Sequence, residues 1–220
     1  MKTIEVKESI TASNDRDAEA LRERLKEDGL FLINLMSSPG SGKTTLLLRT
    51  IADLKDRLKI GVIEADIASD VDAVRIEEAG ARSIQIHTDG MCHVDAGMTE
   101  EALREFDPRG LDLVFLENIG NLICPAEFDT GAMKNVMILS VPEGDDKPLK
   151  YPLMFQKSQV LLVTKTDTVS VFDFDFGKLK ERVKRLNPEI EVFEISAKIG
   201  EGMEAWEERL LSWMEEFRRR

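Results

Sequence analysis

Hydrophobic residues in this chain gather in short runs that are separated by longer stretches of mixed polarity. Seven of these runs are rich in Val, Ile and Leu, and we expect strands at 31–36, 60–64, 83–87, 111–116, 136–141, 160–163 and 191–195. Helical patterns accompany them at 14–27, 44–56, 71–79, 100–106, 176–186 and 203–217. Short apolar runs that alternate with helices are typical of a mostly parallel sheet covered on both faces. The pattern therefore predicts an α/β fold of the doubly wound class.

The same pattern predicts how the chain is organised. At 220 residues the chain can bury one substantial core, so we expect one domain. Residues 30–220 would form this domain, and residues 1–29 an N-terminal extension whose helix packs on it. Ligands of doubly wound sheets bind outside the carboxyl ends of the strands. The loops that follow the predicted strands are thus the first candidates for a site.

Composition narrows the class of protein. The formal net charge of -12 argues against a nucleic-acid partner, which needs a basic face. No stretch is apolar and long enough to cross a bilayer, and the first residues include no apolar signal segment, so we expect a cytoplasmic protein without a membrane partner. The two cysteines, Cys92 and Cys124, are too few for a disulfide framework, and we expect both to be reduced.

A glycine-rich segment follows the first predicted strand directly, and a helical pattern follows the segment. It matches G-x-x-x-x-G-K-S/T except that Ser37 replaces the first glycine. Glycines let the backbone approach phosphate oxygens, Lys43 neutralises the terminal phosphates, and the Thr44 hydroxyl can ligate Mg²⁺. The pattern predicts a P-loop, a nucleotide site formed by Gly40, Ser41, Gly42, Lys43, Thr44 and Thr45.

Acidic residues stand at the ends of two other predicted strands. Asp66 lies just past the second strand and Glu117 closes the fourth, and either carboxylate can hold Mg²⁺ together with Thr44. We expect Lys43, Asp66 and Glu117 to be the catalytic groups, with Asp66 as the candidate for positioning the attacking water. Gly120, in Glu117-Asn118-Ile119-Gly120, occupies the place of the D-x-x-G glycine that senses the γ-phosphate in many GTPases.

Two further motifs indicate which base is bound. Thr164-Lys165-Thr166-Asp167 follows the sixth predicted strand and is similar to the N/T-K-x-D element of GTPases, with Thr164 in the place of Asn. Ser196-Ala197-Lys198 follows the seventh strand and resembles the base-contacting S-A-K loop. A carboxylate at Asp167 accepts hydrogen bonds from guanine, whereas adenine has no donor at either place. The motifs favour GTP over the alternative of a P-loop small-molecule kinase.

The cysteines and one histidine form a candidate metal constellation. Cys92 and His93 are adjacent in the loop after the third strand, and Cys124 lies four residues beyond Gly120. Two thiolates and an imidazole suit Ni²⁺ or Zn²⁺, and the residues leave open which is bound. A free cysteine is more often a small core residue, so a structural role stays an alternative, including that of a zinc protein without useful turnover. Three ligands leave a metal under-coordinated, and a symmetric dimer would complete the shell.

These residues together closely resemble the HypB family, the nickel-incorporation GTPases of hydrogenase maturation. The likeness includes Cys92-His93, the ten residues Glu-Asn-Ile-Gly-Asn-Leu-Ile-Cys-Pro-Ala from Glu117, and Glu-Gly-Asp-Asp-Lys-Pro from Glu143. Its specific parts are the Cys92-His93 pair and the Cys-Pro-Ala element from Cys124, because the nucleotide motifs belong to many GTPases. The resemblance implies a fold of the signal-recognition and MinD-like class, slow GTP hydrolysis, and a nucleotide-linked homodimer with metal held by Cys92, His93 and Cys124 at its interface. It also implies two partners, the hydrogenase large subunit and a companion nickel-maturation protein.

Two details of this resemblance stay open. A related family serves urease and usually carries Cys-Pro-His, and the separate Cys124-Pro125 fits hydrogenase better. MinD-like relatives have an extra lysine where this chain has Ser38, and either Lys147 or Lys150 could supply that cation across a dimer or be an exposed loop lysine. Our hypothesis is that phosphate binding pulls Gly120 inward and draws Cys124 towards Cys92 and His93, so that nucleotide and metal affinities are coupled.

Overall fold

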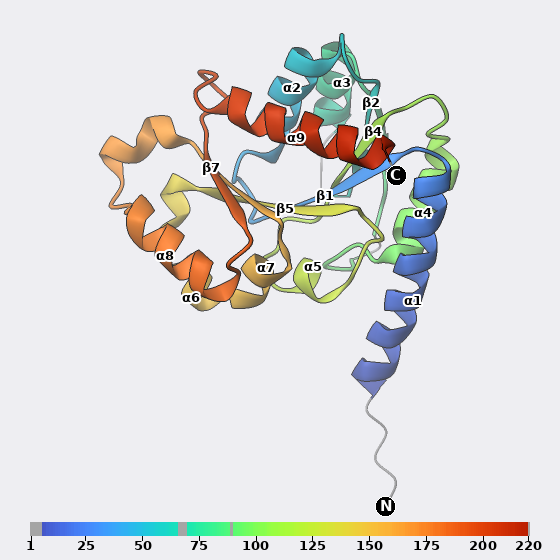
Figure 1. Cartoon of the computed structure of the whole chain (residues 1–220), viewed down its shortest axis with the longest axis horizontal. Coiled ribbons are helices and arrows are strands. Elements are labelled where there is room, and N and C mark those ends of the chain that lie inside the picture. Colours follow the sequence, from blue (N-terminus) through green and yellow to red (C-terminus); the bar gives the residue numbers. More distant parts are fainter. Residues whose placement is uncertain (1–5, 66–69, 89, 220) are drawn as a thin grey trace, which may run out of the picture.

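The predicted strands all form, and they pair into one sheet. The computed structural model describes residues 6–65, 70–88 and 90–219, and within them the strand order is β3-β2-β4-β1-β5-β6-β7 with every neighbouring pair parallel (Figure 1). The strands are β1 Phe31–Ser37, β2 Ile60–Glu64, β3 Arg82–Gln85, β4 Leu113–Glu117, β5 Lys134–Ser140, β6 Val160–Thr164 and β7 Glu191–Glu194. The α/β prediction is confirmed.

The six predicted helical patterns are also helices, and shorter ones accompany them. The helices are α1 Val6–Glu27, α2 Lys43–Leu54, α3 Asp70–Ala79, α4 Ala96–Phe106, α5 Cys124–Glu127, α6 Lys147–Lys150, α7 Pro152–Lys157, α8 Phe176–Leu186 and α9 Met203–Arg218, with 3-10 helices η1 Val141–Glu143 and η2 Thr166–Val171. The sequence pattern missed α5, α6, α7, η1 and η2. The three short α-helices have four to six residues, too few to show a helical period, although each has Pro in its first turn.

Two predicted helices begin earlier than expected, for different reasons. α1 begins at Val6 rather than at residue 14, because Val6 and Ile10 are the only large apolar residues of its first half and the polar Asn14 interrupts the stripe that continues at Ala18. α4 begins at Ala96 rather than at residue 100, because the Asp95 side chain accepts a 2.9 Å hydrogen bond from the Met98 amide and caps the helix.

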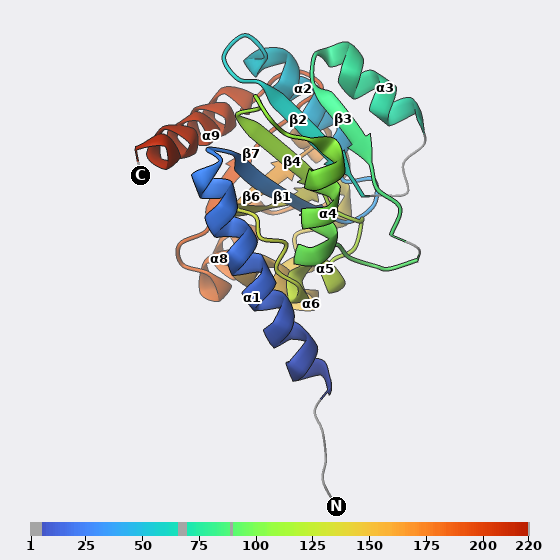
Figure 2. The same cartoon turned by 90° about the vertical axis from the view of Figure 1, so that its right-hand side faces the viewer.

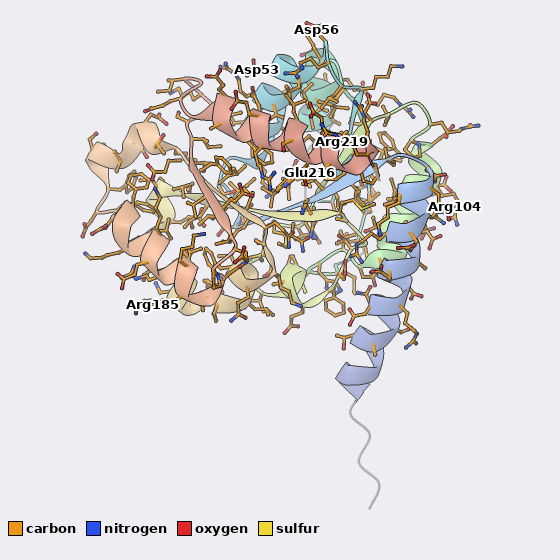
Figure 3. The ribbon with its side chains drawn as sticks, viewed as in Figure 1. Asp53, Asp56, Arg104, Arg185, Glu216 and Arg219 are labelled. Carbon is orange, nitrogen blue, oxygen red and sulfur yellow. The ribbon has the colours of Figure 1, made fainter. Side chains whose placement is uncertain are left out.

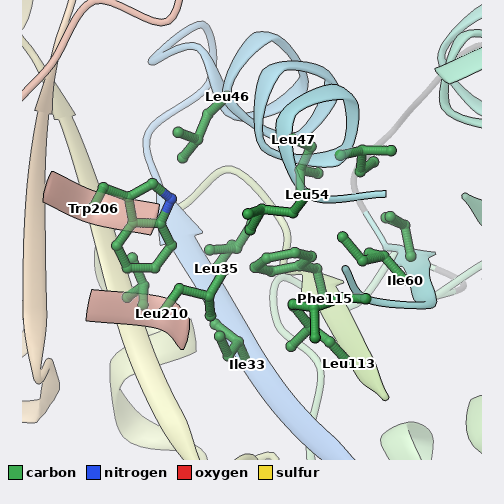
Figure 4. Close-up of a cluster of buried hydrophobic side chains, with 14 of the residues drawn as sticks. Ile33, Leu35, Leu46, Leu47, Leu54, Ile60, Leu113, Phe115, Trp206 and Leu210 are labelled. Carbon is green, nitrogen blue, oxygen red and sulfur yellow. The ribbon is translucent and has the colours of Figure 1, made fainter. Parts of the chain in front are cut away.

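Side chains of β1 alternate between the two faces of the sheet, and both faces are buried. Phe31, Ile33 and Leu35 pack with α2 and α9 in one cluster (Figure 4), whereas Leu32 packs with α1 and α4 on the other face. Met36 belongs to a third cluster, which α7 and α8 cover. Charged side chains such as those of Arg104 and Arg185 lie on the outer surfaces of the helices (Figure 3). The sheet is therefore sandwiched, as its continuous apolar strands predict.

The second half of α1 packs on the domain, and its first half extends beyond it (Figure 2). Leu21 and Leu25 are buried in the cluster shared with α4. The Asn14 side chain donates to the Asp129 carbonyl at 2.9 Å and accepts from the Ala96 amide at 3.0 Å, which ties α1 to the start of α4. None of the helices that the structure describes is long and apolar enough to span a membrane.

Candidate nucleotide and metal site

The parallel sheet brings the candidate loops to a single edge. Each of the segments at 37–45, 92–94, 117–124, 164–168 and 196–198 follows the carboxyl end of a strand, and all strands point the same way. Sequence motifs that are up to 160 residues apart therefore lie next to one another at this edge, as the contacts below show. This is the edge at which doubly wound proteins bind their ligands.

The P-loop has the backbone that phosphate binding requires. Gly40 and Gly42 adopt φ of 73° and 104°, values that only glycine adopts readily. No side chain caps the start of α2 in the described part of the chain, so its first amides and its dipole face the loop. The Ser41 hydroxyl is buried and has no hydrogen-bond partner among the described residues. An unsatisfied donor and open amides in one loop fit a phosphate group.

Lys43 is held within the loop by the serine that replaces the first glycine. Its Nζ donates to Ser37 Oγ at 3.1 Å, and Ser37 Oγ in turn donates to the Ser38 carbonyl at 2.8 Å. Glu117 Oε1 lies 4.0 Å from the same Nζ, and both side chains are about 5% exposed. Ser37 therefore orients the lysine, and its presence is compatible with phosphate binding.

A pair of buried carboxylates adjoins this lysine. Glu117 ends β4 in register with Glu64, which ends β2, and Glu64 is 1% exposed. Carboxylate oxygens, like the hydroxyl of the partly buried Thr44, are hard donors of the kind that suits Mg²⁺. Glu64 was missed at the sequence level, where it appeared only as the last residue of an apolar run. Asp66, the other predicted acid, lies outside the described residues.

The base-recognition motifs meet in a pocket of about 430 Å³. The Thr164 hydroxyl donates to the Ser41 carbonyl at 2.7 Å, Lys165 Nζ donates to the Gly40 carbonyl at 2.6 Å, and the Ser196 hydroxyl donates to Asp167 at 2.6 Å. The pocket is lined by Gly42, Thr45, Thr164, Lys165, Asp167, Thr168, Ser196, Ala197 and Lys198. Both motifs and the P-loop are thus joined by direct hydrogen bonds.

The candidate metal ligands are close together but do not form a ready cage. A hydrogen bond with Cys124, together with burial, raises the pKa of the Cys92 thiol. Cys92 Sγ lies 3.8 Å from His93 Nδ1. The His93 ring is 6% exposed and stacks on Phe128 with centroids 3.8 Å apart, and burial lowers the pKa of the imidazole. Among the described residues, no group of three or more His, Cys, Asp or Glu has an arrangement that could hold a metal ion.

The switch segment, residues 117–121, contacts the P-loop directly. A Cβ added to Gly120 would lie 3.0 Å from the Pro39 backbone nitrogen, so only glycine fits there without displacing the loop. On the other side, Ser38 donates a hydrogen bond to Glu143, which also accepts from the Ser140 amide at 2.8 Å. The sequence predicted no role for the Glu143 side chain, although Ser140-x-x-Glu143 is a visible capping-box pattern.

The two candidate lysines lie in the short helix α6 just beyond Glu143. Lys150 pairs with Asp146 at 2.5 Å, and Lys147 Nζ lies 5.5 Å from the centre of the Tyr151 ring. Both contacts are within the lysines' own segment and leave the Lys150 side chain 58% exposed. Their role across a dimer stays a prediction.

The fold and the phosphate loop define a P-loop nucleotide-binding protein. Residues 31–194 match the family model described as CobW/HypB/UreG, nucleotide-binding domain. The hydrogenase maturation factor HypB of Rhizobium leguminosarum bv. viciae is 46% identical over 212 residues, which cover 96% of this chain and 70% of the relative. The chain therefore belongs to the HypB family of hydrogenase maturation factors, as its motifs predict.

Solved structures support the same assignment. HypB from Helicobacter pylori, crystallised in complex with nickel, superposes with a TM-score of 0.86 at 41% identity over 93% of this chain and 96% of that chain. The signal recognition particle 54 kDa protein from Aeropyrum pernix K1 superposes with a TM-score of 0.56 at 16% identity, over 86% of this chain and 48% of that one. The second likeness shows the fold alone, and that fold agrees with the predicted doubly wound α/β architecture.

Proposed function

We propose that this chain is a GTPase that couples GTP binding and hydrolysis to nickel delivery into the active site of a nickel–iron hydrogenase. The observation that carries the proposal is the contact of Gly120 with Pro39 of the P-loop, on a segment that leads within four residues to Cys124. A nucleotide site and a thiol pair are thereby joined by one short piece of chain. Family membership supplies the hydrogenase context.

Guanine recognition is assigned to Asp167 and its neighbours. The carboxylate would accept hydrogen bonds from guanine N1–H and the exocyclic amino group, and Ser196 holds it in place through the 2.6 Å hydrogen bond. The stem of Lys165 would lie along the ring. Adenine would leave the carboxylate unpaired, which a polar site penalises strongly.

Hydrolysis is assigned to the groups around Lys43. Its ammonium would offset charge on the β- and γ-phosphates, and the Gly120 amide would sense the γ-phosphate. Thr44 and Glu117 would hold Mg²⁺, with Asp66 as the further candidate ligand and the candidate for positioning the water. The magnesium ion would supply charge neutralisation between the phosphates. Turnover is expected to be slow.

Nickel is the cargo rather than a resident cofactor. Cys92, His93 and Cys124 would bind it, and a homodimer would complete the coordination shell by pairing identical patches. Two sulfurs and an imidazole are donor types that suit soft divalent metals, and binding would release the protons of the thiols. The same donors also suit zinc, so the proposal that this is a metal site does not depend on which of the two metals occupies it. Partners would be the hydrogenase large subunit and a companion nickel-maturation protein, in the cytoplasm.

A urease-directed role is the second candidate. The Helicobacter pylori relative, 41% identical over 214 residues, is a hydrogenase/urease maturation factor. Affinity capture of the chain from cells that contain both enzymes separates the two roles, because it should recover hydrogenase maturation partners and not those of urease.

Sedimentation velocity tests the proposed function first. The full chain would be run with GDP or a non-hydrolysable GTP analogue, each with and without Ni²⁺. We expect the analogue or the metal to shift the chain to a dimer, and Cys92→Ala to remove the metal-dependent part. A monomer under all conditions, with nickel affinity independent of nucleotide, would contradict coupling and leave a plain nucleotide-binding domain.

A further inference from the structure

Two asparagines beside Gly120 reach across to the loop of Cys92 and His93. Asn118 Oδ1 accepts from the Val94 amide at 3.3 Å, and Asn121 Nδ2 donates to the Cys92 carbonyl at 3.4 Å. These are the two peptide groups that flank His93 in the chain. The backbone on both sides of His93 is therefore bound by side chains of the switch segment.

Asn121 also holds the second thiol loop. Its Oδ1 accepts from the Ile123 amide at 2.8 Å, immediately before Cys124 at the start of α5. A single amide side chain thus bridges the Cys92 carbonyl and the residue next to Cys124. Asn121 therefore links the segment of Cys92 to the segment that leads into Cys124.

Asn118 anchors the same segment in the sheet. It is fully buried, its Nδ2 donates to Asn34 Oδ1 at 3.0 Å, and Asn34 in turn donates to Asn135 Oδ1 at 3.0 Å. Three amides therefore run across β4, β1 and β5. Because Asn118 Oδ1 already accepts from two backbone amides, those of Ile119 and Val94, only its NH₂ group can face Asn34. The orientation of the Asn118 amide is therefore fixed, as a buried hydrogen-bond network requires.

The P-loop and the thiol loops are joined by this arrangement. Gly120 is packed against Pro39 with no space for a methyl group, and it sits between the two asparagines. Because of this close contact, the P-loop cannot move towards Gly120 at Pro39 unless Gly120 moves as well. Any such movement reaches Cys92 and Cys124 through Asn121, while Asn118 acts as the fixed end.

We propose that Asn121 and Asn118 are positioning residues that convert P-loop occupancy into a change in the spacing of Cys92 and Cys124. This inference rests on the proposed coupling of nucleotide and nickel, and it names the side chains that carry it. The contacts are 3.3 to 3.4 Å long, at the weak end of hydrogen bonding, so they can be remade when the segment moves. Neither residue is required to touch the nucleotide or the metal.

Nickel affinity in two nucleotide states tests the inference. Ni²⁺ binding to the full chain would be measured by titration with GDP and with a non-hydrolysable GTP analogue, and the ratio of the two dissociation constants is the readout. Asn121→Ala removes both hydrogen bonds of this side chain, to the Cys92 carbonyl and from the Ile123 amide, and should bring this ratio about fivefold closer to one. Asn121→Asp keeps an acceptor for the Ile123 amide but loses the donor to Cys92 and adds a negative charge. That charge is present in both nucleotide states, so the ratio of the two dissociation constants should again move towards one.

Asn187→Ala is the matched control. Asn187 donates to the Ser158 carbonyl at 2.8 Å and to the Phe155 carbonyl at 3.2 Å, away from both loops. Its loss should lower the Tm and leave the ratio unchanged, which is the result expected of a merely structural asparagine. Asn121 is partly exposed, so its variants should fold and bind fluorescent GDP normally.

The outcomes separate this inference from the proposed function. A wild-type ratio that differs from one and persists in both Asn121 variants overturns the inference alone. A wild-type ratio of one overturns both, because nothing is then coupled. A ratio closer to one in both Asn121 variants than in the wild type, with unchanged GDP affinity, supports the inference and the proposed function.

Discussion

The base pocket and the thiol loops lie on the same edge of the sheet, but their loops are held differently. At the base pocket, Thr164 and Lys165 are fixed to P-loop carbonyls by hydrogen bonds of 2.7 and 2.6 Å. Around Cys92 and His93, the Val94 amide donates to Asn118 at 3.3 Å, Asn121 donates to the Cys92 carbonyl at 3.4 Å, and Cys92 Sγ is 3.8 Å from His93 Nδ1. The base pocket is already assembled without its ligand. The candidate metal ligands lie near one another, but among the described residues they do not have an arrangement that could hold a metal ion.

This difference matches what each end would have to do. Recognition of a base gains from groups already in place, because no ordering cost is left for the ligand to offset. A site that takes up and gives up a metal needs two states of similar free energy, and weak contacts allow this. The shared P-loop lies between them, bound by strong hydrogen bonds on one side and by the Gly120 contact on the other.

Removal of the P-loop lysine should have the largest effect. In Lys43→Ala the ammonium that meets the phosphates is lost, and GTP affinity should fall by about 100-fold or more. Titration with fluorescent GTP and a phosphate-release assay measure it. Lys55→Ala, just past the far end of α2, is the control and should bind normally. Equal binding by Lys43→Ala would mean that the loop is not the phosphate site.

Loss of the base-pocket carboxylate should abolish discrimination without removing the phosphate contacts. We expect Asp167→Ala to reduce the preference for GDP over ADP by about 100-fold. Competition between GDP and ADP for the labelled site gives the ratio. Asp173→Ala, an acid in the same loop outside the lined pocket, should retain the wild-type preference. An unchanged ratio in Asp167→Ala would reject guanine recognition by this residue.

Loss of one thiol should weaken metal binding and leave nucleotide binding unchanged. Cys124→Ala should weaken Ni²⁺ binding by about 10- to 100-fold, while GDP affinity and Tm stay close to wild type. Met91→Ala, next to Cys92 and 48% exposed, is the control. A large drop in Tm with no change in nickel affinity would instead assign Cys124 a structural role.

The sequence predicted one end of the site more completely than the other. The base pocket could be predicted because each motif is contiguous and follows a strand, so strand order alone brings Thr164 and Ser196 to the P-loop. The role of Glu143 and the Asn118–Asn34 bond could not, because they join residues more than 80 apart through side-chain geometry. The pattern of apolar residues predicts helices, strands and the loops at the strand ends, but it does not predict which side-chain amides form hydrogen bonds with each other. Short helices such as α5 were missed for want of a period.

The smallest expected effect concerns the helices that support the base end, α2 and α9. Burial, together with the nearby Asp53 carboxylate, raises the pKa of Glu207 on α9 to about 7, with Arg49 opposing the shift and Glu204 adding to it. A carboxyl group whose pKa is higher in the folded state than in the unfolded state destabilises the fold once it ionises, and does not do so while it is protonated. Its penalty therefore grows as pH rises from the unfolded value of about 4.5 towards 7, and it is complete above 7.

Glu207→Gln should remove that penalty. Because the side chain is partly exposed, solvent screening reduces the gain to about 1 kcal/mol, or a Tm higher by about 2–4 °C at pH 8. At pH 5 the gain should nearly vanish, and Glu208→Gln, exposed on the same helix, should show no pH-dependent gain. Thermal melts at both pH values measure this. Nickel affinity should not change, since α2 and α9 carry none of the residues that link the P-loop to the thiols; a change would mean that the two ends are coupled through the helices as well as through Asn121.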